Sequence, residues 1–140
     1  MRILLDTNIL VSGLLSTTGP PYRLVASYQS DEFELVTSPR QIEEFERVLG
    51  YAHLRRRVSR LQAQALLETI DVGAVIVREI PVVTYSPDPD DNIILATAIA
   101  GRADYIVSGD KRDMLALREI DGIRIVTAKN AVGLLGLADR

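Results

Sequence analysis

The sequence predicts an α/β fold, a three-layer α/β/α sandwich whose central, mostly parallel sheet has four to five strands. Two observations carry this prediction. Short apolar runs alternate along the chain with longer segments of helical periodicity, which is typical of parallel sheets covered by helices. The length of 140 residues suits one ordinary core. We therefore expect a single domain over residues 1–140, without an internal boundary.

The predicted strands are the short apolar runs, and they cover residues 2–5, 34–37, 74–78, 105–108 and 124–127. Between the first two, Asp6 fits a helix N-cap, since Asp, Thr and Asn all cap helices well and Thr7 and Asn8 follow it. The Gly19-Pro20-Pro21 punctuation then predicts a loop before a short helix around Leu24, Val25 and Tyr28.

The next helix begins at Ser38, which is a good N-cap, with Pro39 in the first helical position and Gln41 completing a capping box. Residues 59–71 have helical periodicity and form an arm or hairpin with that helix. Residues 90–100 are apolar nearly all round, which predicts a heavily buried helix that ends at Gly101. Further helices are expected around Met114 and over residues 131–137.

Composition limits the possible functions. A hydrophobic content of 47% and a charged content of 25% are typical of a globular protein. The longest apolar stretch, residues 93–100, is far shorter than a membrane span, and the acid at position 6 does not fit a signal peptide, so we expect a cytoplasmic protein that does not bind membranes. The absence of cysteine excludes thiolate metal sites, and a single histidine, His53, argues against zinc. The net charge of −3 gives no general attraction to nucleic acid.

Four acids stand where separate segments can deliver them to one place. Asp6 and Asp110 each follow an apolar strand, and ligands of open α/β sheets bind at such carboxyl ends. Asp91 lies on the buried stripe of its own helix, and a buried carboxylate needs a hydrogen bond, a proton or a cation. Glu44 borders the apolar stripe of its helix. Carboxylate oxygens suit Mg²⁺, so the pattern indicates hydrolytic phosphate chemistry.

Each acid also has a simpler explanation. Asp6, taken alone, fits helix capping better than metal binding. Asp88 and Asp90 fit the cap and first turn of the helix that carries Asp91, and Asp91 itself favours the ligand role by a small margin. Glu46 borders the same apolar stripe as Glu44, and a solvated flank is the commoner fate of either.

In its motifs the sequence resembles the PIN domain family, specifically the toxin-like PIN nucleases of the VapC type. The matching segments, in order along the chain, are residues 4–10 with Ser12, residues 38–49, residues 88–92 leading into Ala98, and residues 103–110. The resemblance implies a PIN-like fold with an acidic site at Asp6, Glu44, Asp91 and Asp110. It is also what prefers Glu44 over Glu43 or Glu46.

By this resemblance, Asp6, Asp91 and Asp110 bind one or two Mg²⁺ or Mn²⁺ ions, and Glu44 is a further ligand or a general base acting through water. Clustered carboxylates repel one another until a cation neutralises them. Asn8, Ser12, Ser108 and Lys111 are expected to support the ligands or contact the substrate. The resemblance further implies single-stranded RNA as substrate and a small antitoxin as partner. The helices expected over residues 59–71 and 131–137 are too hydrophobic for their short length unless some surface is shared, which suggests a homodimer.

Evidence for RNA in the residues themselves is limited. Phosphate contacts are expected from Arg55, Arg56, Arg57 and Arg60 and from Lys111 and Arg112, although a solvated helix face explains the arginine run equally well. Aromatic residues able to stack on bases are Tyr22, Tyr51 and Tyr85. His53 fits a packing or surface role better than catalysis.

Two other classes of protein fit part of the pattern. A receiver-like signalling domain also combines a doubly wound sheet with strand-end acids and magnesium, but it carries paired acids at its first strand, where this chain has Asp6 alone. A catalytically inactive PIN-fold binding protein is the second alternative. All four acidic positions are filled in this chain, which favours the nuclease.

Overall fold

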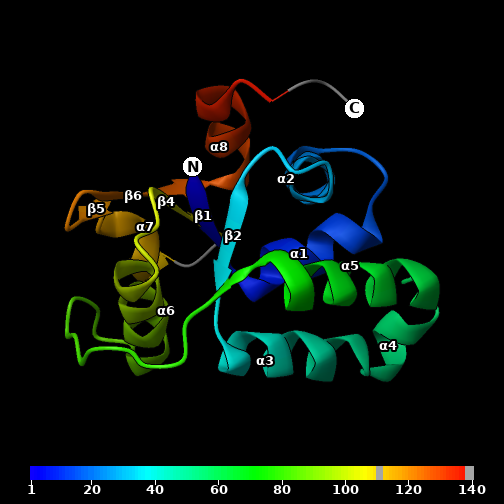
Figure 1. Cartoon of the computed structure of the whole chain (residues 1–140), viewed down its shortest axis with the longest axis horizontal. Coiled ribbons are helices and arrows are strands. Elements are labelled where there is room, and N and C mark those ends of the chain that lie inside the picture. Colours follow the sequence, from blue (N-terminus) through cyan, green and yellow to red (C-terminus); the bar gives the residue numbers. More distant parts are fainter. Residues whose placement is uncertain (110–111, 138–140) are drawn as a thin grey trace.

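The centre of the computed structural model, which describes residues 1–109 and 112–137, is a six-stranded sheet in the order β3-β2-β1-β4-β6-β5 (Figure 1). Its strands are β1 (Arg2–Leu5), β2 (Glu34–Thr37), β3 (Val75–Ile76), β4 (Tyr105–Ser108), β5 (Glu119–Ile120) and β6 (Ile123–Thr127). Strands β1, β2, β3, β4 and β6 pair in parallel, and β5 runs antiparallel to β6. The mostly parallel sheet is confirmed, with one strand more than expected and a shorter β3.

Helices cover both faces of this sheet, as the three-layer prediction requires. Alternate residues of β1 enter two separate cores, Ile3 and Leu5 on one side and Leu4 on the other. The first face is covered by α1 (Thr7–Leu15), α2 (Pro20–Gln29), α3 (Pro39–Leu49), α5 (Arg60–Gly73) and α8 (Ala128–Leu135). The second face is covered by α6 (Pro89–Ala100) and α7 (Arg112–Ala116). None of the described helices is long and apolar enough to cross a membrane.

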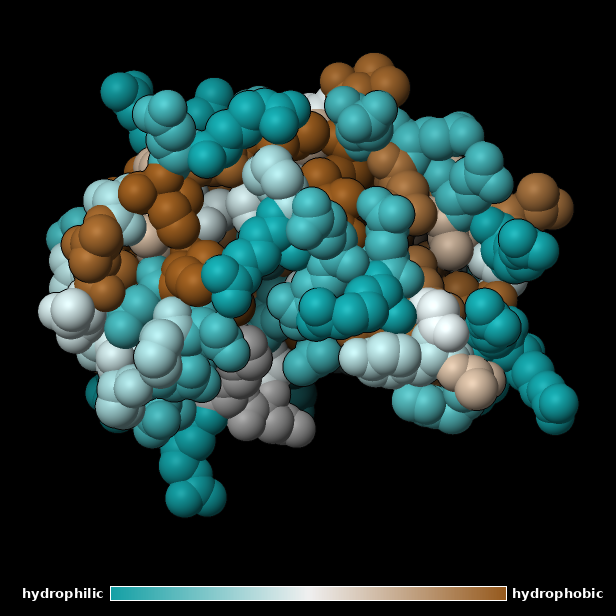
Figure 2. All heavy atoms as spheres, turned by 90° about the horizontal axis from the view of Figure 1, so that it is seen from below, coloured by the Kyte–Doolittle hydropathy of each residue, from teal (hydrophilic) through white to brown (hydrophobic). Residues whose placement is uncertain are grey.

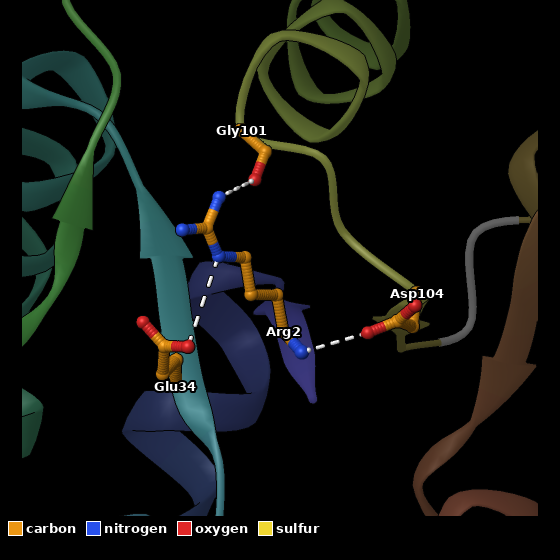
Figure 3. A network of polar contacts seen from close by, with 4 residues as sticks. All are labelled: Arg2, Glu34, Gly101 and Asp104. Carbon is orange, nitrogen blue, oxygen red and sulfur yellow. Dashed lines mark hydrogen bonds and ion pairs between the residues drawn. The ribbon is translucent and has the colours of Figure 1, made fainter.

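Arg2, at the amino end of β1, holds the C-terminal end of α6 in place (Figure 3). The Arg2 guanidinium donates from Nη1 to the carbonyl oxygen of Gly101, just after α6, at 3.0 Å, and its Nε lies 3.8 Å from Glu34 Oε1 on β2. The Arg2 backbone N–H donates to Asp104 Oδ2 at 2.9 Å. Helix α6 therefore ends at the amino ends of the strands, and its first turn lies at their carboxyl ends.

The close packing of α6 on β2 requires a glycine. A Cβ placed on Gly101 would overlap Cγ1 of Val36 and would lie 3.0 Å from Cγ2 of Val77. Gly101 has φ −83°, which any residue can adopt, so sterics alone exclude a side chain there.

The helix caps largely follow the sequence prediction. The hydroxyl of Ser38 accepts a hydrogen bond from the Gln41 backbone N–H at 3.2 Å, and Asp88 Oδ1 accepts one from the Asp90 N–H at 2.9 Å. The prediction of a complete capping box at α3 is wrong. Gln41 is buried and its Oε1 accepts no hydrogen bond within the described part of the chain, so the reciprocal bond to the Ser38 N–H is not made.

Helices α3 and α5 form the arm expected from the sequence, joined through the short α4 (Ala52–Arg55) (Figure 1). Phe45 of α3 and Leu66 and Ile70 of α5 reach the core beneath the sheet, and Leu54 of α4 is also buried. The turn at α4 points away from the sheet. One end of α3 therefore lies at the carboxyl edge of β2, and its other end lies in the arm.

Candidate active site

The carboxyl ends of β1 and β4 bring together several of the residues expected at the site. Leu5 pairs with Val107, and the backbone N–H of Asp6 donates to the Val107 carbonyl oxygen at 3.0 Å, so Asp6 and Ser108 leave adjacent strands side by side. A Cβ placed on Gly109 would lie 3.9 Å from the Asn8 Cβ, which brings the end of β4 against the first turn of α1. This edge faces the viewer in Figure 2, where hydrophilic side chains occupy much of its middle.

Asp6 is 3% exposed, and its side chain caps α1 by accepting a hydrogen bond at Oδ1 from the Asn8 N–H at 3.4 Å. The capping role that the sequence favoured for Asp6 is therefore confirmed. That hydrogen bond uses one carboxylate oxygen, and a carboxylate has several acceptor positions. Capping and metal binding are compatible at this residue.

Asp91 is 2% exposed and lies in the first turn of α6, so its predicted inward orientation is confirmed. Its Oδ2 accepts a hydrogen bond from the hydroxyl of Ser86 at 3.0 Å. Asn92 holds the same serine by its backbone, with hydrogen bonds of 2.8 Å to both the N–H and the carbonyl oxygen of Ser86. The segment before α6 therefore positions this carboxylate.

Ser86 is a functional candidate that the sequence analysis missed. It is buried, and its hydroxyl also accepts a hydrogen bond from the Asp88 N–H at 3.1 Å. A serine shortly before an inward-facing acid was the available signal. Its role depends on a loop conformation that hydrophobic periodicity does not reveal.

Glu44 is half-buried on α3, whereas Glu43 and Glu46 are exposed, so burial agrees with the preference for Glu44. A surface ion pair joins Arg40 of α3 to Asp90 of α6, with Nη2 and Oδ1 3.5 Å apart. Because α3 and α6 cover opposite faces, this pair spans the carboxyl end of the sheet. Glu44 follows Arg40 by four residues and so lies on the same side of α3, one turn further along.

A model of the PIN domain family matches residues 2–112. The chain belongs to the PIN domain family. PIN domains are metal-dependent nucleases that typically bind Mg²⁺. The comparisons with curated proteins and with solved structures give no match.

Family membership removes the receiver-like alternative, and the topology agrees. Receiver-like domains have strand order 2-1-3-4-5, with β1 between β2 and β3. In this PIN domain β1 lies between β2 and β4, and β3 is at the edge beyond β2.

The donor chemistry of this PIN domain fits a hard divalent cation. The buried side chains of Asp6, Asp91 and Ser108 offer oxygen atoms at this edge, as Mg²⁺ prefers. Ser108 is 1% exposed, and its Oγ has no hydrogen-bond partner within residues 1–109 and 112–137, so the hydroxyl is suited to hold a ligand or a water. Ser12 lies half-buried on α1.

The four predicted acids are described only in part. Asp110 and Lys111 lie outside the described residues. Among the remaining residues, no three aspartate, glutamate, histidine or cysteine side chains lie together closely enough to hold a metal ion. The described part of this PIN domain thus contributes two buried carboxylates and a half-buried glutamate, from three different elements.

Proposed function

We propose that this PIN domain is a Mg²⁺- or Mn²⁺-dependent endoribonuclease that hydrolyses phosphodiester bonds of single-stranded RNA. The observation that carries the proposal is the burial of Asp6 and Asp91 at the carboxyl edge of the sheet, one after β1 and one in the first turn of α6. Carboxylates at one edge of the sheet are the oxygen ligands that a hard divalent cation prefers, and sharing such an ion neutralises their negative charge.

In this proposal Asp6, Asp91 and Asp110 hold the ion, and Glu44 is a fourth ligand or a base acting through a water. The bound cation supplies charge neutralisation at the scissile phosphate and activation of the attacking water. Ser86 holds the Asp91 carboxylate in orientation through its 3.0 Å hydrogen bond. Ser108 and Asn8 support the ligands from the adjacent strand end and helix turn, and Lys111 contacts the substrate.

We further propose that the enzyme is the toxin of a toxin-antitoxin pair, inhibited by a small antitoxin, and that it forms a homodimer. The sequence resemblance supports the toxin role. Apolar side chains left exposed on α5 and α8 support a shared surface, since Leu61 is 81% exposed, Val72 is 89% exposed and Leu134 is 47% exposed.

The decisive experiment is cleavage of end-labelled single-stranded RNA in Mg²⁺, in Mn²⁺ and in chelator, with protein freed of any co-purifying partner. We expect cleavage only with metal, and its loss in Asp91→Asn. The matched control is Asp90→Asn, which makes the same change one residue earlier. The Asp90 side chain is exposed, and its one contact within the described residues is the surface ion pair with Arg40, so we expect this variant to retain cleavage.

Two outcomes would reject the proposal. Equal cleavage by wild type and Asp91→Asn would show that Asp91 is not part of the site. Binding of Mg²⁺ without cleavage of any RNA would favour the catalytically inactive PIN-fold binding protein instead.

A further inference from the structure

The end of the arm has a high local density of arginine. The stretch from Arg47 to Leu67 contains five arginines and no acid, in a chain of net charge −3. Four of them, Arg55, Arg56, Arg57 and Arg60, are exposed, and their guanidinium groups form no hydrogen bond or ion pair with the described part of the chain. By contrast, Arg2 and Arg40 are paired with acids. The arm therefore carries positive charge that the protein itself does not neutralise.

A cavity of about 600 Å³ lies beside these arginines, between α3 and α5. Leu49, Val58 and Leu67 supply its apolar lining, and Arg55 and Arg60 line it too, with Glu46 as the one acid. A volume in this range accommodates a small organic group of nucleotide size. Apolar side chains next to unpaired guanidinium groups suit a ligand that combines a flat apolar ring with negative charge.

Two exposed aromatic rings complete this surface. The rings of Tyr51 and His53 lie in contact, with centroids 6.0 Å apart and planes inclined by 30°. Tyr51 caps α4 and is 44% exposed, so its ring is accessible to a partner. Aromatic faces beside a basic groove are the features that bind unpaired bases of single-stranded nucleic acid.

These three features together favour single-stranded RNA over an acidic protein. Arginine alone attracts either polyanion, but only an unpaired nucleotide offers a base for the cavity and for the Tyr51 ring. The arm is also within reach of the cleavage site. Helix α3 starts at the carboxyl edge of β2 and its 11 residues span roughly 16 Å.

We propose that the end of the arm is a second RNA-binding site, where Arg55 and Arg60 hold phosphates, an unpaired base occupies the α3–α5 cavity and another base stacks on the exposed ring of Tyr51. The site rests on the proposed function in that RNA is the substrate class. It holds the strand roughly one α3 length from the cleaved bond and so contributes affinity without taking part in the chemistry.

The test is binding of a fluorescent single-stranded RNA of about 12 nucleotides, measured by anisotropy in chelator at several salt concentrations. The variants are Arg55→Gln with Arg60→Gln, and separately Tyr51→Leu. Loss of two phosphate contacts should lower the slope of log K against log salt by about 1.4 and weaken binding roughly 25-fold at 0.1 M salt. Tyr51→Leu should weaken binding several-fold with an unchanged slope, because stacking is not an ionic contact.

The matched control is Arg78→Gln with Arg124→Gln, which removes two exposed arginines elsewhere and should leave the affinity within about twofold. Equal weakening by both arginine pairs, or no RNA binding by the wild type, would overturn the proposal. Competition by polyglutamate as strong as by RNA would overturn it in favour of an acidic protein partner. The binding assay contains no free metal and so does not depend on cleavage. Tight RNA binding in this assay, together with no RNA cleavage in Mg²⁺ or Mn²⁺, would reject the proposed nuclease function and leave this site standing.

Discussion

The packing of α6 against β2 leads to a sharp prediction for Gly101→Ala. The added Cβ would overlap Cγ1 of Val36, which is fully buried and β-branched, and would lie 3.0 Å from Val77. A valine in a parallel strand has little rotamer freedom to move aside. Overpacking of this kind costs about 1–3 kcal/mol, or roughly 3–10 °C in Tm for a chain of this size.

The assay is urea denaturation followed by circular dichroism, with Gly133→Ala as the control. Gly133 lies inside α8 with nothing within 4 Å of a built Cβ, so alanine there should stabilise the protein by about 0.5–1 kcal/mol. In a Val36→Ala background the cost of Gly101→Ala should shrink, since the overlapping methyl group is gone. Unchanged stability of Gly101→Ala would refute the close approach of α6 to the sheet, and with it the position of Asp91.

Two further predictions concern Ser86 and Tyr28. Ser86→Ala removes the 3.0 Å hydrogen bond to Asp91, so it should lower the free energy of unfolding by about 1–3 kcal/mol and slow metal-dependent cleavage. The control is Ser59→Ala, which removes an exposed helix cap and should leave the cleavage rate unchanged. Burial, and to a lesser extent the charge of Asp31, raises the pKa of Tyr28 above its usual value of 10.0. As the pH rises, the unfolded state therefore loses this proton before the folded state does. The stability that Tyr28 confers is complete below pH 10 and should fall as the pH rises through the folded-state pKa. Urea denaturation from neutral to strongly alkaline pH should show a steeper loss in wild type than in Tyr28→Phe, and parallel curves would contradict this.

The sequence predicted the strands best where burial is continuous. Strands β1, β2 and β4 are apolar runs covered on both faces, and their predicted ranges match the structure. Strand β5 was missed because it is only two residues long. The available signal was the Asp121-Gly122 pair before β6, whose φ angles of 46° and 79° make the tight turn of a hairpin.

For the site, periodicity predicted the inward direction of Asp91 because a helix places residues three and four apart on one face. The contacts of Ser86 and Gln41 could not be predicted in this way. Ser86 depends on the loop before α6, and Gln41 points into the protein and does not fold back on Ser38. The direct test of the metal site therefore lies with the acids themselves.

Asp6→Asn separates the two roles that the structure allows Asp6. Asparagine caps a helix as well as aspartate does, so the hydrogen bond from the Asn8 N–H can persist while the negative charge is lost. If Asp6 binds the ion, the variant should keep its Tm in chelator, lose cleavage, and lose the rise in Tm that Mg²⁺ gives the wild type by binding only the folded state.

Asp88→Asn is the matched control, because Asp88 caps α6 in the same way and has no proposed role in binding metal. It should retain both cleavage and the Mg²⁺-dependent rise in Tm. If Asp6→Asn behaved like this control, Asp6 would be a helix cap alone. The metal would then have to be held without the Asp6 carboxylate, and the acidic site proposed at the carboxyl edge of the sheet would be refuted.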